Sequence, residues 1–415
     1  MSDKRNKLEE NIDILVKDGK IQNIDKNITK RADKIIDVNR KIVMPGLINT
    51  HAHVPMSIFR ETLDGYNLQD WLEKKIWPME DKLTNEDIYY ASLLSFLEMI
   101  KTGCTTINDM YFMQEEIIKA AIHLGIRLQT TRTLMDLTND GNVRLEELEN
   151  LIKKYDKIEE IVTLNIGIHG FYTTNAQYIE KCANLARKYN KIVHIHFCEN
   201  TKEREDIKKA YNVQNPVELI KKYFKGLHII LAHSVKLTKE EIQELSNENI
   251  HISHCPVSNL KLGCGIANIS YMLKNGINVS IGTDGQGSGS NLDIFEAMKY
   301  TALLQKGILE DPKELPAYNV LKMATVNGAK ALGLEKQIGT IEEGKSADLI
   351  ILNLDTVTAM PINNIFSEIV YNIKGTNVET TIINGKIVME NRFVNGINEY
   401  YVYEKCNEII KRINN

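Results

Sequence analysis

Between residues 45 and 335 the chain repeats one pattern, in which a short apolar run typical of a buried strand is followed by an amphipathic stretch typical of a helix. Strands that alternate with helices form parallel sheets whose two faces are both buried. The pattern therefore predicts an α/β fold, a (β/α)₈ TIM barrel. The expected strands are 46–53, 104–109, 126–134, 162–171, 191–199, 228–234, 250–256 and 278–285.

Two of the intervening segments carry clear helix-start signals. Thr84 is followed three residues later by Asp87, and Thr238 is followed in the same way by Glu241. This spacing is typical of a capping box, in which the threonine hydroxyl and the later carboxylate each accept a hydrogen bond from the other residue's backbone N–H. We therefore expect helices to begin at these two points.

The two ends of the chain have a different pattern, that of β-hairpins. Asp18-Gly19 and Asn384-Gly385 are dipeptides that favour primed turns, and each lies between short apolar runs. Neither end is long enough to bury a core by itself. We therefore expect residues 1–44 and 339–398 to form one small composite β-sandwich, residues 45–338 to form the barrel, and residues 399–415 to form a C-terminal helix.

Side chains suited to binding a metal ion stand at the ends of the expected strands. They are His51 and His53, then His194 and His196 with Glu199 just after them, then His233 and Asp284. Side chains two residues apart on a strand point the same way, so His51 and His53 can reach one ion. Hydrogen bonding inside a core would explain any one of these histidines, but not all of them at strand ends. Nitrogen ligands with one carboxylate predict a Zn²⁺ or Fe²⁺ site with an open position for chemistry.

Composition and charge limit the binding partners and the cellular location that we expect for this protein. The net charge is −4 and the isoelectric point is about 6.2, so we expect neither nucleic acid nor an anionic membrane as a partner. The first residues are too charged for a signal peptide, and no apolar run approaches the roughly 18 residues of a membrane span. Six cysteines without a CxxC pair indicate reduced thiols. We expect a cytoplasmic protein that binds a small molecule, and the sequence leaves a homo-oligomer open.

Four segments resemble the amidohydrolase superfamily, and the resemblance extends through nearly the whole chain, including Glu343–Leu349. Within the superfamily the chain is similar to the branch of 5-methylthioadenosine/S-adenosylhomocysteine deaminases. The resemblance implies hydrolytic deamination of adenine nucleosides with release of ammonia. The expected substrates are 5-methylthioadenosine and S-adenosylhomocysteine, with 5′-deoxyadenosine and adenosine as further ones. The four segments are Pro45–His53, His194–Glu199, His254–Leu262 and Gly282–Gly285.

The resemblance also implies roles for the strand-end residues. One divalent ion, Zn²⁺ with Fe²⁺ as the alternative, would be held by His51, His53, His196 and Asp284. Binuclear relatives use a bridging lysine at the end of the fourth strand, and the segment 162–171 contains none. Glu199 would protonate the purine ring, while His233 and Asp284 would take the proton of the attacking water. We interpret His194 as support for the ligands rather than as one of them.

The resemblance also implies which residues contact the substrate. Glu80 would hold the ribose hydroxyls, Trp71 would pack beside the nucleoside, and His169 would form a hydrogen bond with the purine, which Glu199 also contacts. Arg132 and Arg144 would bind the carboxylate of a homocysteine tail, because guanidinium groups pair with carboxylates bidentately.

Other functions remain open at this point. Guanine deaminases and triazine-type chlorohydrolases would use the same metal ligands, and a catalytically inactive barrel that serves as an assembly module is an alternative of a different class. The zinc class of cytidine deaminases is excluded, because its Pro-Cys-x-x-Cys signature does not occur. Two departures from the resembling family stand out. The segment Met1–Glu10 offers no strand, and the loop Gly285–Asn291 is unusually rich in glycine and could alter specificity.

Overall fold

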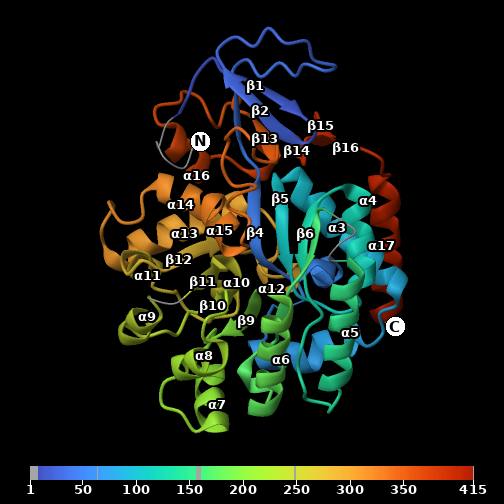
Figure 1. Ribbon diagram of the computed structural model, residues 1–415, viewed down its shortest axis with the longest axis vertical. Coiled ribbons are helices and arrows are strands. Elements are labelled where there is room, and N and C mark those ends of the chain that lie inside the picture. The colour runs from blue at the N-terminus through green and yellow to red at the C-terminus, as the bar shows by residue number, and fades with distance from the viewer. Residues whose placement is uncertain (1–7, 63, 156–159, 247–248, 415) are drawn as a thin grey trace.

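A computed structural model describes residues 8–62, 64–155, 160–246 and 249–414, and its centre is a barrel of parallel strands (Figure 1). One sheet has the order β4-β5-β6-β7 and the next has the order β12-β11-β10-β9-β8, with every pair parallel. The strands are β4 (Leu47–Ala52), β5 (Cys104–Asp109), β6 (Arg127–Thr130), β7 (Val162–Leu164), β8 (Ile166–Ile168), β9 (Val193–Phe197), β10 (Ile229–His233), β11 (Ile250–His254) and β12 (Asn278–Ile281).

Backbone hydrogen bonds join the two sheets into a ring. Asn165 separates β7 from β8, and its N–H donates to the Thr130 carbonyl at 3.0 Å, while the N–H of Ile166 donates to Ile192 at 3.0 Å. These two short strands therefore act as one strand with neighbours on both sides. At the other seam the N–H groups of Thr283 and Asp284 donate to the His51 carbonyl at 3.2 and 3.0 Å. The predicted eight-stranded barrel is confirmed.

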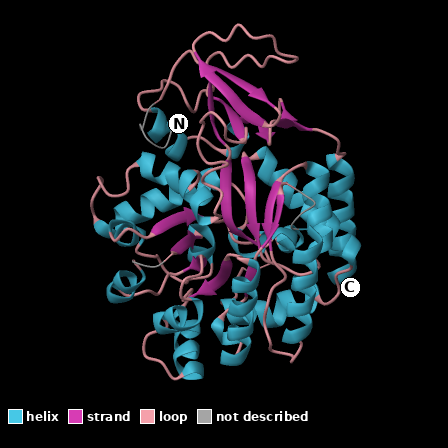
Figure 2. Cartoon of the chain, in the orientation of Figure 1, coloured by secondary structure: helices cyan, strands magenta, loops and turns pink. Residues whose placement is uncertain are grey.

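Helices surround the barrel on its outer side (Figure 2). The predicted capping boxes at Thr84 and Thr238 are both present and open α3 (Asn85–Lys101) and α9 (Lys239–Leu245). The other helices of the barrel part are α4 (Gln114–Leu124), α5 (Gly141–Tyr155), α6 (Ala176–Tyr189), α7 (Thr201–Tyr211), α8 (Val217–Phe224), α10 (Pro256–Lys261), α11 (Ile269–Lys274), α12 (Gln286–Gly289), α13 (Ile294–Leu309), α14 (Ala317–Met323) and α15 (Val326–Ala331). Short helical segments follow the first strand, namely η1 (Val54–Phe59), α1 (Leu68–Trp71), η2 (Leu72–Ile76) and α2 (Trp77–Glu80).

The two ends of the chain meet in antiparallel sheets at one end of the barrel (Figure 1). The predicted hairpins are present, and an unpredicted strand, β3, links the N-terminal part to the C-terminal sheet by pairing with β13. Ile21, Ala347, Leu349 and Ile382 form a small apolar cluster of their own. The domain boundaries given above remain a prediction. The strands are β1 (Asp13–Lys17) with β2 (Lys20–Asp25), and β3 (Lys41–Pro45), β13 (Leu349–Asn353), β14 (Val378–Ile383), β15 (Lys386–Glu390) and β16 (Phe393–Val394).

A buried ion pair ties the terminal sheet to the barrel. Arg127, at the start of β6, donates from Nε and Nη2 to the two carboxylate oxygens of Asp348, at 2.9 and 3.1 Å. Both side chains are buried. Asp348 lies in the segment Glu343–Leu349 that carried part of the family resemblance. The ion pair with Arg127 gives this residue a structural role.

The remaining helices are α16 (Ile365–Tyr371) and α17 (Glu399–Asn414), and the latter is the predicted C-terminal helix. The six cysteines are all buried free thiols. Within the described ranges, no helix has both the length and the apolar character needed to cross a membrane.

Candidate active site

Four side chains converge at the ends of three strands in the geometry of a metal site. The Nε2 atoms of His51 and His53 lie 3.4 and 3.2 Å from Oδ1 of Asp284, and Nε2 of His196 lies 3.3 Å from Nε2 of His53. Ligands about 2.0–2.1 Å from a tetrahedral zinc ion lie about 3.3 Å from each other. Nε2 of His51 is also buried without a hydrogen bond. These residues therefore fit one divalent ion.

The Nδ1 atom of each of the three histidines forms a hydrogen bond with a group outside this set of four. Nδ1–H of His53 donates to the Met110 carbonyl at 2.6 Å, and Nδ1–H of His196 donates to the His169 carbonyl at 2.6 Å. Nδ1 of His51 shares a hydrogen bond of 2.9 Å with Nε2 of His194. A proton on Nδ1 leaves the Nε2 lone pair free to bind a metal. His194 thus lies behind His51, in agreement with its interpretation as support.

Asp284 is fixed by two hydroxyl groups that the sequence did not single out. The hydroxyls of Ser258 and Ser288 each donate to Oδ2 at 2.6 Å, which leaves Oδ1 facing His51 and His53. Burial alone would raise the pKa of Asp284, but the ion-pair contacts of its Oδ1 with His51 and His53 hold the pKa well below the usual range. The carboxylate is therefore ionised.

Glu199 and His233 form a second pair beside this centre. Oε1 of Glu199 lies 3.9 Å from Nδ1 of His233, whose N–H donates to Oδ1 of Asn259 at 2.8 Å. Burial, together with the charge of Asp284, raises the pKa of Glu199. Burial would lower the pKa of His233, but the charges of Glu199 and Asp284 raise it. A carboxyl group with a raised pKa next to a histidine is a pair suited to proton transfer.

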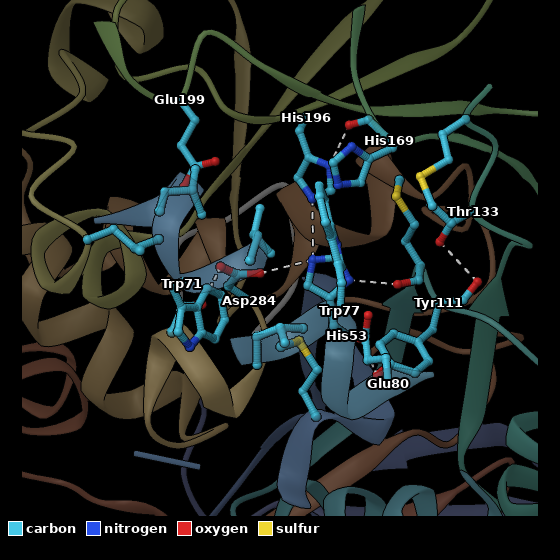
Figure 3. A pocket seen from close by; sticks show the side chains of 18 of the residues that line it. His53, Trp71, Trp77, Glu80, Tyr111, Thr133, His169, His196, Glu199 and Asp284 are labelled. Carbon is cyan, nitrogen blue, oxygen red and sulfur yellow. Dashed lines mark hydrogen bonds and ion pairs between the residues drawn. The ribbon is translucent and has the colours of Figure 1, made fainter. Parts of the chain in front are cut away.

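A cavity of about 710 Å³, counted with its open mouth, lies over these groups (Figure 3). Most of the predicted site residues line the cavity: His53, Trp71, Glu80, His169, His196, Glu199, His233 and Asp284. Lining residues that the sequence analysis missed include Trp77, Tyr111, Phe112, Thr133, Met135 and Tyr172. Tyr111 and Phe112 lie two and three residues after the expected strand 104–109, and this position near a strand end was the signal available in the sequence.

The predicted nucleoside contacts lie on the walls of the cavity (Figure 3). Burial raises the pKa of Glu80 to about 7, and Tyr111 donates its hydroxyl proton to Oε1 of Glu80 at 2.5 Å. Trp71 is held by a hydrogen bond from Nε1 to the Thr62 hydroxyl at 3.2 Å. Burial lowers the pKa of His169 to about 4, so its ring is neutral at pH 7. These groups offer both stacking surface and hydrogen bonds.

The two predicted arginines lie together but not on the cavity wall. Their guanidinium groups lie 5.2 and 5.8 Å from the ring centre of Phe112, which does line the cavity. Nε of Arg132 is 2.8 Å from Glu147, and Nε of Arg144 is 2.6 Å from Asp140. Nη1 of Arg132 is buried without a hydrogen bond. Their contact with a substrate carboxylate stays a prediction.

The glycine-rich loop packs closely under the cavity wall. A Cβ atom added at Gly287 would lie 2.6 Å from the Trp71 ring, and one added at Gly285 would lie 2.6 Å from Sδ of Met56. Trp71 and Met56 both line the cavity. The absence of side chains at Gly285 and Gly287 therefore leaves room for Met56 and Trp71, which links the loop to the shape of the site.

Comparison with known proteins agrees with this geometry. The Amidohydrolase family model matches residues 42–388, and the chain belongs to this family. It is 41% identical over 375 residues to a 5-methylthioadenosine/S-adenosylhomocysteine deaminase of Moorella thermoacetica, covering 90% of this chain and 87% of that protein. It is 39% identical over 407 residues to a 5′-deoxyadenosine deaminase of Methanobrevibacter smithii, covering 96% and 93%. A zinc-bound adenosine deaminase structure from Xanthomonas campestris superposes with a TM-score of 0.94 at 26% identity, covering 98% and 94%. The predicted family is confirmed.

Proposed function

We propose that the protein is a metal-dependent deaminase of adenine nucleosides, which replaces the 6-amino group by oxygen and releases ammonia. The observation that carries the proposal is the position of Glu199 and His233, 3.9 Å apart beside the converging histidines and Asp284 in one cavity. The names of the two relatives, each about 40% identical over most of the chain, support the substrate class.

We propose that His51, His53, His196 and Asp284 hold one divalent ion, Zn²⁺ with Fe²⁺ as the alternative. Such an ion, when bound, lowers the pKa of water toward ~7 and so supplies a nucleophile at neutral pH. The strand from Val162 to Ile168 contains no lysine that could bridge a second ion. The zinc in the Xanthomonas structure supports the choice of metal.

The proton transfers are assigned to three side chains. Glu199 donates a proton to the ring nitrogen next to the reacting carbon, a role that its raised pKa supports. His233 and the ionised Asp284 accept the proton of the attacking water. The proton taken from the water then passes to the amino group, which leaves as ammonia. The remaining hydroxyl proton returns to Glu199 as the carbonyl group forms.

Substrate recognition is assigned to the cavity wall and to the arginine pair. Glu80 accepts hydrogen bonds from the ribose hydroxyls, Trp71 packs beside the nucleoside, and His169 contacts the purine. Arg132 and Arg144 bind the carboxylate of S-adenosylhomocysteine, which requires them to exchange Glu147 and Asp140 for the substrate. A cytoplasmic location is part of this proposal, supported by six free thiols.

Ammonia release from a panel of compounds tests the proposed function. The panel contains adenosine, 5′-deoxyadenosine, 5-methylthioadenosine, S-adenosylhomocysteine and guanine. We expect turnover of the adenine nucleosides and none of guanine. Turnover of guanine alone would identify a guanine deaminase, and no turnover by metal-loaded protein would favour an inactive barrel.

A further inference from the structure

A buried carboxylate from the first turn of α7 reaches back to the end of β9. Oε1 of Glu203 accepts the N–H of Cys198 at 2.9 Å, and Oε2 accepts the N–H of Glu199 at 2.6 Å. Glu203 is 2% exposed, and it does not line the cavity. Both of its oxygens are therefore engaged by the backbone that directly precedes the Glu199 side chain.

The backbone that Glu203 holds has an unfavourable conformation. Cys198 has a φ of 51°, in the left-handed region that residues other than glycine rarely adopt. Such a conformation persists only where neighbouring groups hold it in place. Here the carbonyl groups are held as well, because Phe197 accepts the N–H of Ser234 at 3.0 Å and Cys198 accepts the N–H of Lys236 at 2.9 Å. The turn is thus fixed on its amide side by Glu203 and on its carbonyl side by the segment after β10.

The carboxyl carbon of Glu199 is only three bonds from the Cα atom that follows this turn. Its Oε1 is 3.9 Å from Nδ1 of His233 and 3.7 Å from Sγ of Cys264. A change of the Cys198 dihedral angles would therefore move the carboxyl group relative to His233 and to the cavity.

We propose that Glu203 is a positioning residue for Glu199. It anchors two consecutive amides, keeps Cys198 in the left-handed conformation, and so aims the Glu199 carboxyl group into the cavity without touching the substrate. The assignment rests on the proposed function, because it takes Glu199 as the group that moves the proton.

The variants E203Q and N200A separate positioning from helix stability. The amide nitrogen of E203Q cannot accept a hydrogen bond, so one backbone N–H loses its partner. Oδ1 of Asn200 caps the same helix by accepting the N–H of Glu203 at 2.8 Å, and N200A removes this cap but leaves the Glu203 carboxylate in place. The measurements are kcat, KM, metal content and hydrogen–deuterium exchange of the peptide that contains Cys198 and Glu199.

For E203Q we expect kcat to fall about 10- to 100-fold, the cost of misplacing a catalytic group by about 1 Å. KM should stay within about twofold and metal content should not change, while exchange at the Cys198–Glu199 peptide becomes faster. N200A should lower the melting temperature but keep kcat within about twofold. If N200A loses as much kcat as E203Q, or if E203Q acts on KM or metal content alone, the positioning role is overturned.

A double variant gives an independent check. If Glu203 acts through Glu199, E203Q should lower kcat by no more than about twofold in an E199Q background, because the two effects are not additive. Full additivity contradicts the proposal. Should E203Q fail to fold, E203D takes its place, since its side chain is one methylene too short to hold both amides. A wild-type protein that releases no ammonia refutes the proposed function, whereas unchanged exchange in E203Q refutes the positioning role.

Discussion

At the scale of single residues, the proposed metal ligands are oriented by groups outside the set of four. The imidazoles of His53 and His196 face one another through Nε2 because the Met110 and His169 carbonyls hold their Nδ1 atoms. The hydroxyl groups of Ser258 and Ser288 hold Oδ2 of Asp284, so that its Oδ1 faces the histidines. These outer contacts orient the side chains toward one another.

Changing Glu199 to Gln tests the proton-transfer role directly. The amide keeps the shape of the side chain and leaves the four ligands intact, but it cannot give up a proton. We expect metal content to be unchanged and kcat to fall by at least about 10²-fold. E205Q is the matched control, because Glu205 lies on the exposed side of α7 with a side chain that is 61% exposed. Turnover close to wild type in E199Q would remove Glu199 from the mechanism.

The double variant R132A/R144A tests the carboxylate contact. Each lost charge-assisted hydrogen bond costs about 1.5–3 kcal/mol, roughly ten- to a hundredfold in kcat/KM for S-adenosylhomocysteine. Adenosine has no carboxylate and serves as the internal control, for which we expect little change. Equal losses on both substrates would mean that the arginines only support Phe112 at the cavity wall.

Sequence analysis singled out the side chains that converge in the candidate site but missed several residues of the cavity wall. His51, His53, His196 and Asp284 stand out because each ends an apolar run, and a strand end has a known place in a barrel. Ser258 and Ser288 carry no such signal, because their roles depend on where the loops after β11 and β12 fold. Tyr111 and Phe112 were missed although they follow a predicted strand.

At the scale of elements, the sequence predicted those features that depend on residues close together in the chain. The capping boxes at Thr84 and Thr238 involve residues three apart, and both were predicted. Strand β3 (Lys41–Pro45) was missed because its partner is β13, about three hundred residues further along the chain, and only Gly46 separates it from the first barrel strand. Pairing over that distance leaves no short-range pattern.

The junction between the terminal sheet and the barrel should depend on Asp348. D348A removes the carboxylate and leaves the Arg127 guanidinium buried without its partner, which typically costs about 3–5 kcal/mol in the free energy of unfolding. Urea titration measures this loss. E390Q is the control, because the Lys34–Glu390 pair is exposed and such pairs contribute about 0–1 kcal/mol. A loss in D348A no larger than in E390Q would show that the ion pair does not hold the junction.

At the scale of the whole molecule, two of the proposed metal ligands lie at the seam where the barrel closes. His51 lies on the first barrel strand and Asp284 follows the last one, and the Asp284 N–H donates to the His51 carbonyl across the seam at 3.0 Å. The sequence predicted that the barrel closes, but this particular contact between its two ends is known only from the folded chain. A ligand that binds only the folded state also stabilises it. Metal removal is therefore expected to lower the melting temperature as well as the activity.

The central claim is that one metal ion per chain supports nucleoside deamination, and titration of metal-free protein tests it most directly. Chelator-treated protein is reloaded with Zn²⁺ or Fe²⁺ in steps, and ammonia release from 5-methylthioadenosine is measured at each step. The account predicts no activity without metal and a linear rise that levels off at about one equivalent per chain, because the four ligands hold one ion. A plateau at about two equivalents, or full activity in metal-free protein, would contradict it.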